Sequence, residues 1–211
     1  MIAVEGMIPE DIQTIRRELR QSALSKRNAL SPEVRHLSSL EIIERLKQYI
    51  EGKSAVADGV LHCYISFRSE VETREFIEGA IRYGMRVIVP IVEASDPADQ
   101  TRIGRLVHTE ISGITGLTKG RFGLEEPTER EPSSLELVDT VIVPIVAFDR
   151  RGTRLGYGKG FYDVFLRELP RSVERIGLAF STQEVDHIPA LPHDEPLDTI
   201  ITEREIIHTI E

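Results

Sequence analysis

Apolar side chains recur every three or four residues near the start of the chain, a pattern that predicts an amphipathic helix. This helix is expected from near Pro9 to near Leu30, and its apolar face carries Ile12, Ile15 and Leu19. Arginine and lysine residues occupy most of its remaining surface. The usual outcome for such charges is a face that stays in contact with water.

A second helix is marked at both of its ends. Ser31 followed by Pro32 is typical of an N-cap and a first helical position, and Gly52 is a typical helix stop. The apolar residues between these markers again repeat at helical spacing. They are Val34, Leu37, Leu40, Ile43, Leu46 and Ile50.

From residue 60 onward, short apolar runs alternate with a helical pattern. A strand over 60–66 precedes a helix that Thr73 caps and Gly84 stops, and a strand follows over 86–90. This order predicts parallel strands joined by a right-handed crossover. Further strands are expected over 139–143, 175–180 and 199–202, with an antiparallel strand over 102–108, whereas 113–121 and 183–197 are expected to be loops.

The chain shows no internal repeat, low-complexity tract or evident domain break. We therefore predict one α/β domain over residues 1–211, a mostly parallel sheet with helices on both faces. The pattern leaves open whether residues 1–9 are ordered.

Composition narrows the range of partners. A net charge of −9 and a pI near 5.3 argue against non-specific nucleic-acid binding, which usually needs a basic face. The one cysteine, Cys63, cannot form an internal disulfide and lies in an apolar run, so we expect a buried strand residue rather than a nucleophile. With no secretory signal and no run of about 18 apolar residues, we expect a cytoplasmic protein without a membrane partner. The sequence leaves monomer and homodimer open.

Residues 149–163 form a cationic, glycine-rich segment between an apolar run and a helical pattern. Glycines let backbone N–H groups approach an anion, the first N–H groups of a helix have no internal partner, and Lys or Arg adds charge. The segment therefore predicts a polyphosphate cradle. It matches neither the P-loop nor the dinucleotide fingerprint, since its last glycines are Gly156, Gly158 and Gly160. The alternative is a mobile hairpin turn with solvated charges.

Two aspartates are candidate metal ligands. Asp163 lies in the first turn of the helix that follows the glycines, where it could hold Mg²⁺ beside phosphates. Asp198 precedes a predicted strand and could reach the same ion if the strands are neighbours. The alternative for Asp198 is an ordinary turn residue.

Two further positions are candidate ligand contacts. Arg16, Arg17 and Arg20 gather in little more than one turn of the first helix, although a solvated face remains the alternative. Glu70 follows a buried strand, and ligands of open α/β sheets bind beyond the carboxyl ends of strands. A simple loop acid is the other interpretation of Glu70.

Together these segments resemble the 5-formyltetrahydrofolate cyclo-ligase family, also called 5,10-methenyltetrahydrofolate synthetase. The resemblance extends roughly over residues 15–203, and its most specific part is 143–163, which includes Val-Pro-Ile-Val-Ala-Phe-Asp and Gly-Thr-Arg-Leu-Gly-Tyr-Gly-Lys-Gly-Phe-Tyr-Asp. Four shorter pieces agree in order: Leu19-Arg20, residues 69–73, residues 122–127 and residues 198–203.

The resemblance implies a three-layer fold of the sugar-phosphate isomerase and CoA-transferase type. It also implies ATP- and Mg²⁺-dependent conversion of 5-formyltetrahydrofolate to 5,10-methenyltetrahydrofolate, in which the formyl oxygen is phosphorylated and N10 closes the ring. Lys159 and Arg154 would stabilise the transferred phosphoryl group, and Asp163 and Asp198 would hold Mg²⁺. The residues implied to hold ATP are Arg16, Arg17, Glu18, Leu19, Arg20, Arg154, Leu155, Gly156, Tyr157, Gly158, Lys159, Gly160, Phe161 and Tyr162. Those implied to line the folate are Ile65, Glu70, Tyr157, Gly158, Lys159, Gly160 and Phe161.

The chain departs from the common family pattern at two positions. Arg16 stands where Lys is common, so a planar guanidinium that donates two hydrogen bonds side by side replaces a point charge. Phe161 stands where Tyr is frequent. Two competing functions remain open on sequence grounds. One is a sugar-phosphate isomerase or acyl-CoA-type enzyme, which would need no ATP; the other is a nucleotide- or folate-binding regulator without catalysis.

Overall fold

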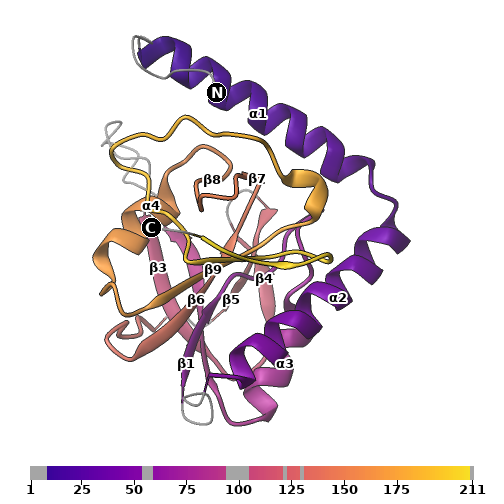
Figure 1. The fold of residues 1–211 in the computed structure, drawn as a ribbon. Coiled ribbons are helices and arrows are strands. Elements are labelled where there is room, and N and C mark those ends of the chain that lie inside the picture. The colour runs from indigo at the N-terminus through magenta and orange to yellow at the C-terminus, as the bar shows by residue number, and fades with distance from the viewer. Residues whose placement is uncertain (1–8, 54–58, 94–104, 121–122, 129–130, 210–211) are drawn as a thin grey trace.

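A seven-stranded sheet with the order β11-β10-β9-β6-β1-β2-β3 forms the centre of the molecule (Figure 1). The computed structural model describes residues 9–53, 59–93, 105–120, 123–128 and 131–209. The strands are β1 (Val60–Cys63), β2 (Arg86–Glu93), β3 (Arg105–Ile111), β6 (Val138–Pro144), β9 (Glu174–Leu178), β10 (Thr199–Ile201) and β11 (Ile206–His208). β2, β1, β6, β9 and β10 pair in parallel, and the two edge strands are antiparallel to their neighbours. The predicted mostly parallel sheet is confirmed.

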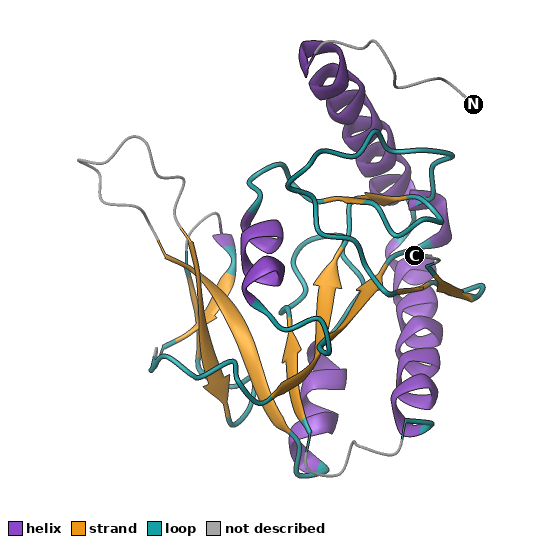
Figure 2. Cartoon of the chain, turned by 60° about the vertical axis from the view of Figure 1, so that its left-hand side comes forward, coloured by secondary structure: helices purple, strands orange, loops and turns teal. Residues whose placement is uncertain are grey.

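Helices cover both faces of this sheet (Figure 2). On one face, α2 (Pro32–Glu51) and α3 (Arg74–Arg82) pack through residues such as Leu46 and Ile77 against Leu61 and Ile142. On the other face, α4 (Phe161–Glu168) packs Phe165 and Leu166 against Val141 and Val143. The predicted three-layer arrangement is therefore confirmed.

The long helix α1 (Pro9–Ala29) lies outside these layers and crosses the end of the molecule that carries a short hairpin. The hairpin consists of β7 (Ala147–Phe148) and β8 (Arg154–Leu155). Ala23 of α1 packs in a small cluster with Ala147 and Leu155. α1 thus brings its charged face to the chain segment that follows β8.

The end signals of α2 act as predicted, but its apolar face is only half buried. Ser31 Oγ accepts a hydrogen bond from the N–H of Val34 at 3.2 Å, and Gly52 follows the last helical residue. Ile43, Leu46 and Ile50 are buried, whereas Val34, Leu37 and Leu40 are 47%, 54% and 46% exposed. Helical spacing identifies the apolar face of α2 but does not reveal how far the covering sheet extends along it.

Short elements were the least predictable. The expected loop over 113–121 contains β4 (Leu117–Lys119), which pairs with β5 (Glu125–Pro127) in a two-stranded sheet. No strand was expected at β11, and a hairpin turn entered only as the alternative for residues 149–163, the first part of which does turn between β7 and β8. Thr73 precedes α3 but makes no side-chain cap; its hydroxyl donates to the carbonyl of Tyr64 at 2.7 Å.

Cys63 is confirmed as a buried strand residue, with a fully inaccessible thiol whose pKa is raised by burial. Within the described ranges, no helix combines the length and the apolar character that crossing a bilayer requires. The question of order at residues 1–9 lies, except for Pro9, outside the described residues.

Candidate functional site

A cavity of about 650 Å³ opens at the carboxyl ends of three neighbouring parallel strands. Tyr64 follows β1, Pro90 and Val92 lie near the end of β2, and Pro144 ends β6. This is the edge of an open α/β sheet at which ligands bind, because the loops that follow the strands gather there.

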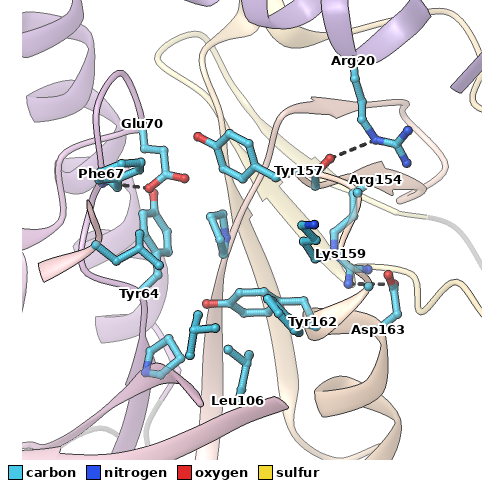
Figure 3. A pocket seen from close by; sticks show the side chains of 18 of the residues that line it. Arg20, Tyr64, Phe67, Glu70, Leu106, Arg154, Tyr157, Lys159, Tyr162 and Asp163 are labelled. Carbon is cyan, nitrogen blue, oxygen red and sulfur yellow. Dashed lines mark hydrogen bonds and ion pairs between the residues drawn. The ribbon is translucent and has the colours of Figure 1, made fainter. Parts of the chain in front are cut away.

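The cavity has two chemically different sides (Figure 3). Figure 3 shows Glu70, Phe67 and Tyr64 on one side, Arg20, Arg154 and Asp163 on the other, and Lys159 between them. The first side is largely apolar and includes Ile65, Phe67, Val92, Leu106 and Leu124, whereas the second combines the glycine loop with Arg16, Arg20, Arg154 and Lys159. Such a cavity suits a flat organic ring against one wall and a polyanion against the other.

The glycine loop runs from Gly156 to Gly160 and leads directly into α4. Gly158 and Gly160 have φ angles of 89° and 70°, in the left-handed region where a side chain would be strained. Among the described residues, no acceptor is found for the backbone N–H groups of Gly158, Lys159, Gly160 and Phe161. These unpaired donors at the start of a helix form the anion cradle that the sequence predicted.

Lys159 is the most available cation beside this cradle. It is exposed, lines the cavity, and forms no ion pair or hydrogen bond with any residue of the described ranges. An ammonium group that has no protein partner keeps its charge available for a bound anion.

Arg154 is held in the cavity wall by Asp163. Its guanidinium is 6% exposed and donates to Asp163 Oδ1 at 2.9 Å and to the carbonyl of Glu195. Burial lowers the pKa of Arg154, and the Asp163 carboxylate partly offsets this effect. Asp163 Oδ1 also accepts a hydrogen bond from the N–H of Glu195 at 3.2 Å, whereas Oδ2 accepts no hydrogen bond from a described residue. One carboxylate oxygen therefore remains for a cation.

Asp198 does not join Asp163, contrary to the expected pairing at one ion. It lies at the amino end of β10, where its carboxylate accepts the N–H of Arg175 at 2.7 Å. There it lines a second cavity, of about 720 Å³, together with Asp139 and Glu174. Because β10 is parallel to β6 and β9, a residue that precedes it lies at the opposite end of the sheet from Pro144. Asp198 thus occupies the turn position that was its alternative.

Arg16 and Arg20 face the cavity, so the solvated-face alternative is wrong for both. Arg16 is 5% exposed and donates to both carboxylate oxygens of Asp194, at 2.5 and 2.8 Å. Although burial acts in the opposite direction, the hydrogen bonds from Arg16 lower the pKa of Asp194. Arg20 donates through Nε to the carbonyl of Gly156 at 3.0 Å, and burial together with Arg16 lowers its pKa.

Four other residues implied for ATP differ in their surroundings. Arg17 and Glu18 are exposed and do not line the cavity. Leu19 and Leu155 belong to the apolar cluster that joins α1 to the hairpin, so they support the site without facing it. Tyr157, Phe161 and Tyr162 line the cavity, as do Gly156, Gly158 and Gly160.

The buried hydroxyl of Tyr162 meets no hydrogen-bond partner among the described residues. Burial also raises the pKa of this phenol well above its usual range. A buried hydroxyl without a partner is unfavourable, and a polar group of a ligand would satisfy it.

Glu70 belongs to the loop that follows β1, and Ile65 of the same loop also lines the cavity. Glu70 Oε2 accepts the N–H of Phe67 at 2.9 Å, and burial raises the pKa of this carboxyl group. Sequence reasoning missed the residue that fixes this loop, Arg27 of α1. The Arg27 guanidinium is 1% exposed and donates to Ser69 Oγ at 3.1 Å and to the hydroxyl of Tyr157 at 2.7 Å.

Arg27 thus ties the Glu70 loop to the glycine loop. Its position offered a signal, because it lies seven residues after Arg20 and therefore on the same face of the helix. Asp194 was also missed, within a loop whose polar, proline-rich sequence gave no sign of an inward carboxylate.

The model of the 5-formyltetrahydrofolate cyclo-ligase family matches residues 12–203. The chain belongs to this family. The match contains every candidate site residue named above, from α1 to β10.

Several proteins that are similar to this chain are named 5-formyltetrahydrofolate cyclo-ligase or 5,10-methenyltetrahydrofolate synthetase. The 5-formyltetrahydrofolate cyclo-ligase of Escherichia coli K12 is 29% identical over 184 residues, which cover 86% of this chain and 96% of that protein. The mouse protein is 28% identical, with 91% of this chain and 95% of that protein covered. A solved structure, the 5,10-methenyltetrahydrofolate synthetase of Aquifex aeolicus, is 30% identical with a TM-score of 0.77 and covers 93% of this chain and 94% of its own.

Proposed function

We propose that this protein converts 5-formyltetrahydrofolate to 5,10-methenyltetrahydrofolate, with hydrolysis of ATP to ADP and phosphate. The observation that carries the proposal is one cavity that joins a cradle of backbone N–H groups, which have no acceptor among the described residues, to an apolar wall. Membership of the cyclo-ligase family supports the choice of substrate, because the relatives named above bear the name of this reaction.

The chemical difficulty lies in the formyl group. An N-formyl group is an amide, so its carbon is a poor electrophile and its oxygen a poor leaving group. In the proposed reaction the formyl oxygen attacks the terminal phosphorus of ATP, and the bond to ADP breaks. N10 then attacks the formyl carbon and loses its proton, the carbon–oxygen bond breaks, and phosphate departs with that oxygen.

The residues on the cationic side place and neutralise the phosphates. The free N–H groups around Gly158 would bind phosphate oxygens, and the Lys159 ammonium would offset the charge that is transferred. Arg154 would add charge from a fixed position, because its contact with Asp163 holds it in the wall. Arg16 would act mainly by holding Asp194 and the cavity wall in place, since both terminal nitrogens of its guanidinium already donate to the Asp194 carboxylate.

The residues present suit a magnesium ion at Asp163. Mg²⁺ usually takes one or two protein carboxylates with phosphate oxygens and water, and Asp163 Oδ2 is uncommitted at the mouth of the phosphate cradle. When bound, the ion would neutralise charge on the phosphate oxygens. Asp198 is not part of this proposal, because it faces the other cavity.

The apolar side orients the folate. Ile65 and Phe67 would pack against its ring system, and the Glu70 carboxyl group would bind polar hydrogens at the ring edge. Glu70 is held in place for this role by Phe67 and, through Ser69, by Arg27.

The test is an assay of purified protein with ATP, Mg²⁺ and 5-formyltetrahydrofolate. The near-ultraviolet absorbance of the methenyl product and the ADP released should rise together in a ratio of one to one, and neither should rise when ATP or Mg²⁺ is omitted. ATP binding without ADP formation would instead favour a non-catalytic binder. Folate turnover that consumes no ATP would also refute the proposal, as would the absence of any product.

A further inference from the structure

The loop that carries Glu70 contains an unusual backbone conformation. The N–H of Glu70 donates to the carbonyl of Phe67 at 3.2 Å, which makes Arg68 and Ser69 the central residues of a tight turn. Arg68 has a φ of 54°, and it is the only non-glycine residue with a positive φ in the described parts of the chain. Glycine or asparagine is usual at such a position, so arginine is strained there.

This strained turn is clamped from both sides. Glu70 Oε2 accepts the N–H of Phe67 at 2.9 Å, closing the turn with a second hydrogen bond. Ser69 Oγ accepts from the buried Arg27 and donates to Asn28 Oδ1 at 2.6 Å. Arg68 therefore cannot leave the left-handed region unless these contacts break. Strain that neighbouring contacts enforce is characteristic of binding sites.

The side chain of Arg68 lines the same cavity but has no acidic partner. Its guanidinium lies over the ring of Phe67, 4.7 Å from the centroid, and forms no ion pair with a residue of the described ranges. Of the arginines on the opposite side, Arg16 is paired with Asp194 and Arg154 with Asp163, whereas Arg20 donates to the carbonyl of Gly156. The cavity thus presents an unpaired cation on each side, Lys159 by the phosphate cradle and Arg68 by the apolar wall.

We propose that Arg68 binds the carboxylates of the glutamyl tail of the folate substrate. The proposal rests on the proposed function, in which the phosphates of ATP engage the glycine loop and Lys159. The remaining anionic groups of the reactants are then the tail carboxylates, which lie at the end of the folate away from the reacting ring. Because the protein carries a net charge of −9, a carboxylate that approaches it needs a local cation.

The geometry of Arg68 favours a carboxylate over other anions at this place. A planar guanidinium can donate two parallel hydrogen bonds to a carboxylate. Stacking on Phe67 restricts the side chain beforehand, so less conformational freedom is lost on binding. Phe67 directly precedes Arg68 and Ile65 lies three residues before it, so a ring packed on the apolar wall would have its tail within reach of the turn.

The test compares two substrates with three variants. The substrates are 5-formyltetrahydrofolate and the analogue that ends at the aminobenzoate and lacks glutamate. Arg68→Gly removes the cation and suits the turn, Arg68→Lys keeps a charge without the fork, and Arg82→Gln removes an exposed charge that lies away from the cavity. KM for each folate, KM for ATP and the melting temperature are measured for all.

Arg68→Gly should raise KM for 5-formyltetrahydrofolate about 5- to 10-fold, the range of a charged contact at a partly solvated site. KM for the analogue and for ATP should not change, and the melting temperature should stay the same or rise. Arg68→Lys should recover part of the loss, and Arg82→Gln should match the unaltered protein.

An unchanged KM for 5-formyltetrahydrofolate in Arg68→Gly would overturn the proposal, as would an equal rise for the analogue. A rise in KM for ATP instead would assign Arg68 to the nucleotide. Each of these outcomes requires turnover by the unaltered protein. Absence of turnover there would count against the proposed function itself, so the two failures are distinguishable.

Discussion

Acidification should destabilise this protein through a pair of histidines beneath α4, the buried His62 and the half-buried His108. His62 Nε2 lies 3.0 Å from His108 Nδ1, and both rings contact Phe165, with centroid separations of 4.5 and 4.3 Å. Burial lowers the pKa of His108 to about 4, and burial together with His108 lowers the pKa of His62 well below its usual range. Both imidazoles are therefore neutral in the folded protein at pH 5.

The magnitude follows from the difference between folded and unfolded pKa. An unfolded histidine has a pKa of about 6.5, so below that pH the unfolded chain takes up protons that folded His108 does not. The free energy of unfolding therefore falls as pH falls through 6.5. With a folded value of about 4, His108 alone accounts for about 2 kcal/mol between pH 7.5 and pH 5, and its partial contact with water reduces this to about 1–2 kcal/mol. His62 acts in the same direction.

Urea unfolding followed by circular dichroism from pH 5 to pH 8 measures this effect, and His108→Gln isolates it. The stability advantage of the unaltered protein over His108→Gln should shrink by about 1–2 kcal/mol on going from pH 7.5 to pH 5. His36 is a control with the opposite sign, because the hydrogen bond that its ring donates to the Glu72 carboxylate raises its pKa. Stability from His36 is present below pH 6.5 and is lost as pH rises through the raised value. A difference between His108→Gln and the unaltered protein that does not vary with pH would refute the reasoning.

Three further predictions concern the site and its support. Lys159→Met should lower kcat/KM about 10²-fold or more, because it removes an unpaired cation beside the phosphate cradle, whereas Lys159→Arg should retain much of the rate. Steady-state kinetics on both variants measures this effect. Equal kcat/KM for Lys159→Met and the unaltered protein would exclude this role for Lys159. Asp163→Asn should shift the Mg²⁺ titration of activity to higher concentration, and an unshifted titration would remove Asp163 from the metal site. Gly177→Ala should lower the free energy of unfolding by about 1–3 kcal/mol, because the added methyl carbon would lie 2.4 Å from Ile145 Cδ1 in the core. Urea unfolding measures this, and an unchanged unfolding midpoint would contradict the prediction.

Elements with several turns of regular pattern were predictable from sequence, and short ones were not. α1 and α2 begin and end within about one residue of expectation, because apolar spacing and the Ser31, Pro32 and Gly52 signals agree. The β7–β8 hairpin and β11 contain two or three residues per strand, too few to show a period. Their pairing depends on distant segments, which a local pattern does not describe.

The candidate site was predictable where its residues are contiguous in sequence. The cradle from Gly156 to Phe161 follows from local chemistry, since glycines, cations and a helix start are all visible in one segment. Whether Asp163 and Asp198 lie close together depends on the direction of β10, which the sequence does not reveal. Because β10 pairs in parallel with β9, the two aspartates lie at opposite ends of the sheet. Arg27 shares a helix face with Arg20, but no pattern within α1 shows which loop will cover it.

The bond between Arg16 and Asp194 has a consequence for the order in which this protein can be made. It joins residues 178 positions apart in the sequence, so during synthesis the Arg16 guanidinium cannot meet this carboxylate until the chain as far as Asp194 has left the ribosome. A shortened chain that ends before this loop would keep the glycine cradle and yet lack one wall around it. Bound reactants would therefore have their full set of contacts only in a chain that extends through this loop.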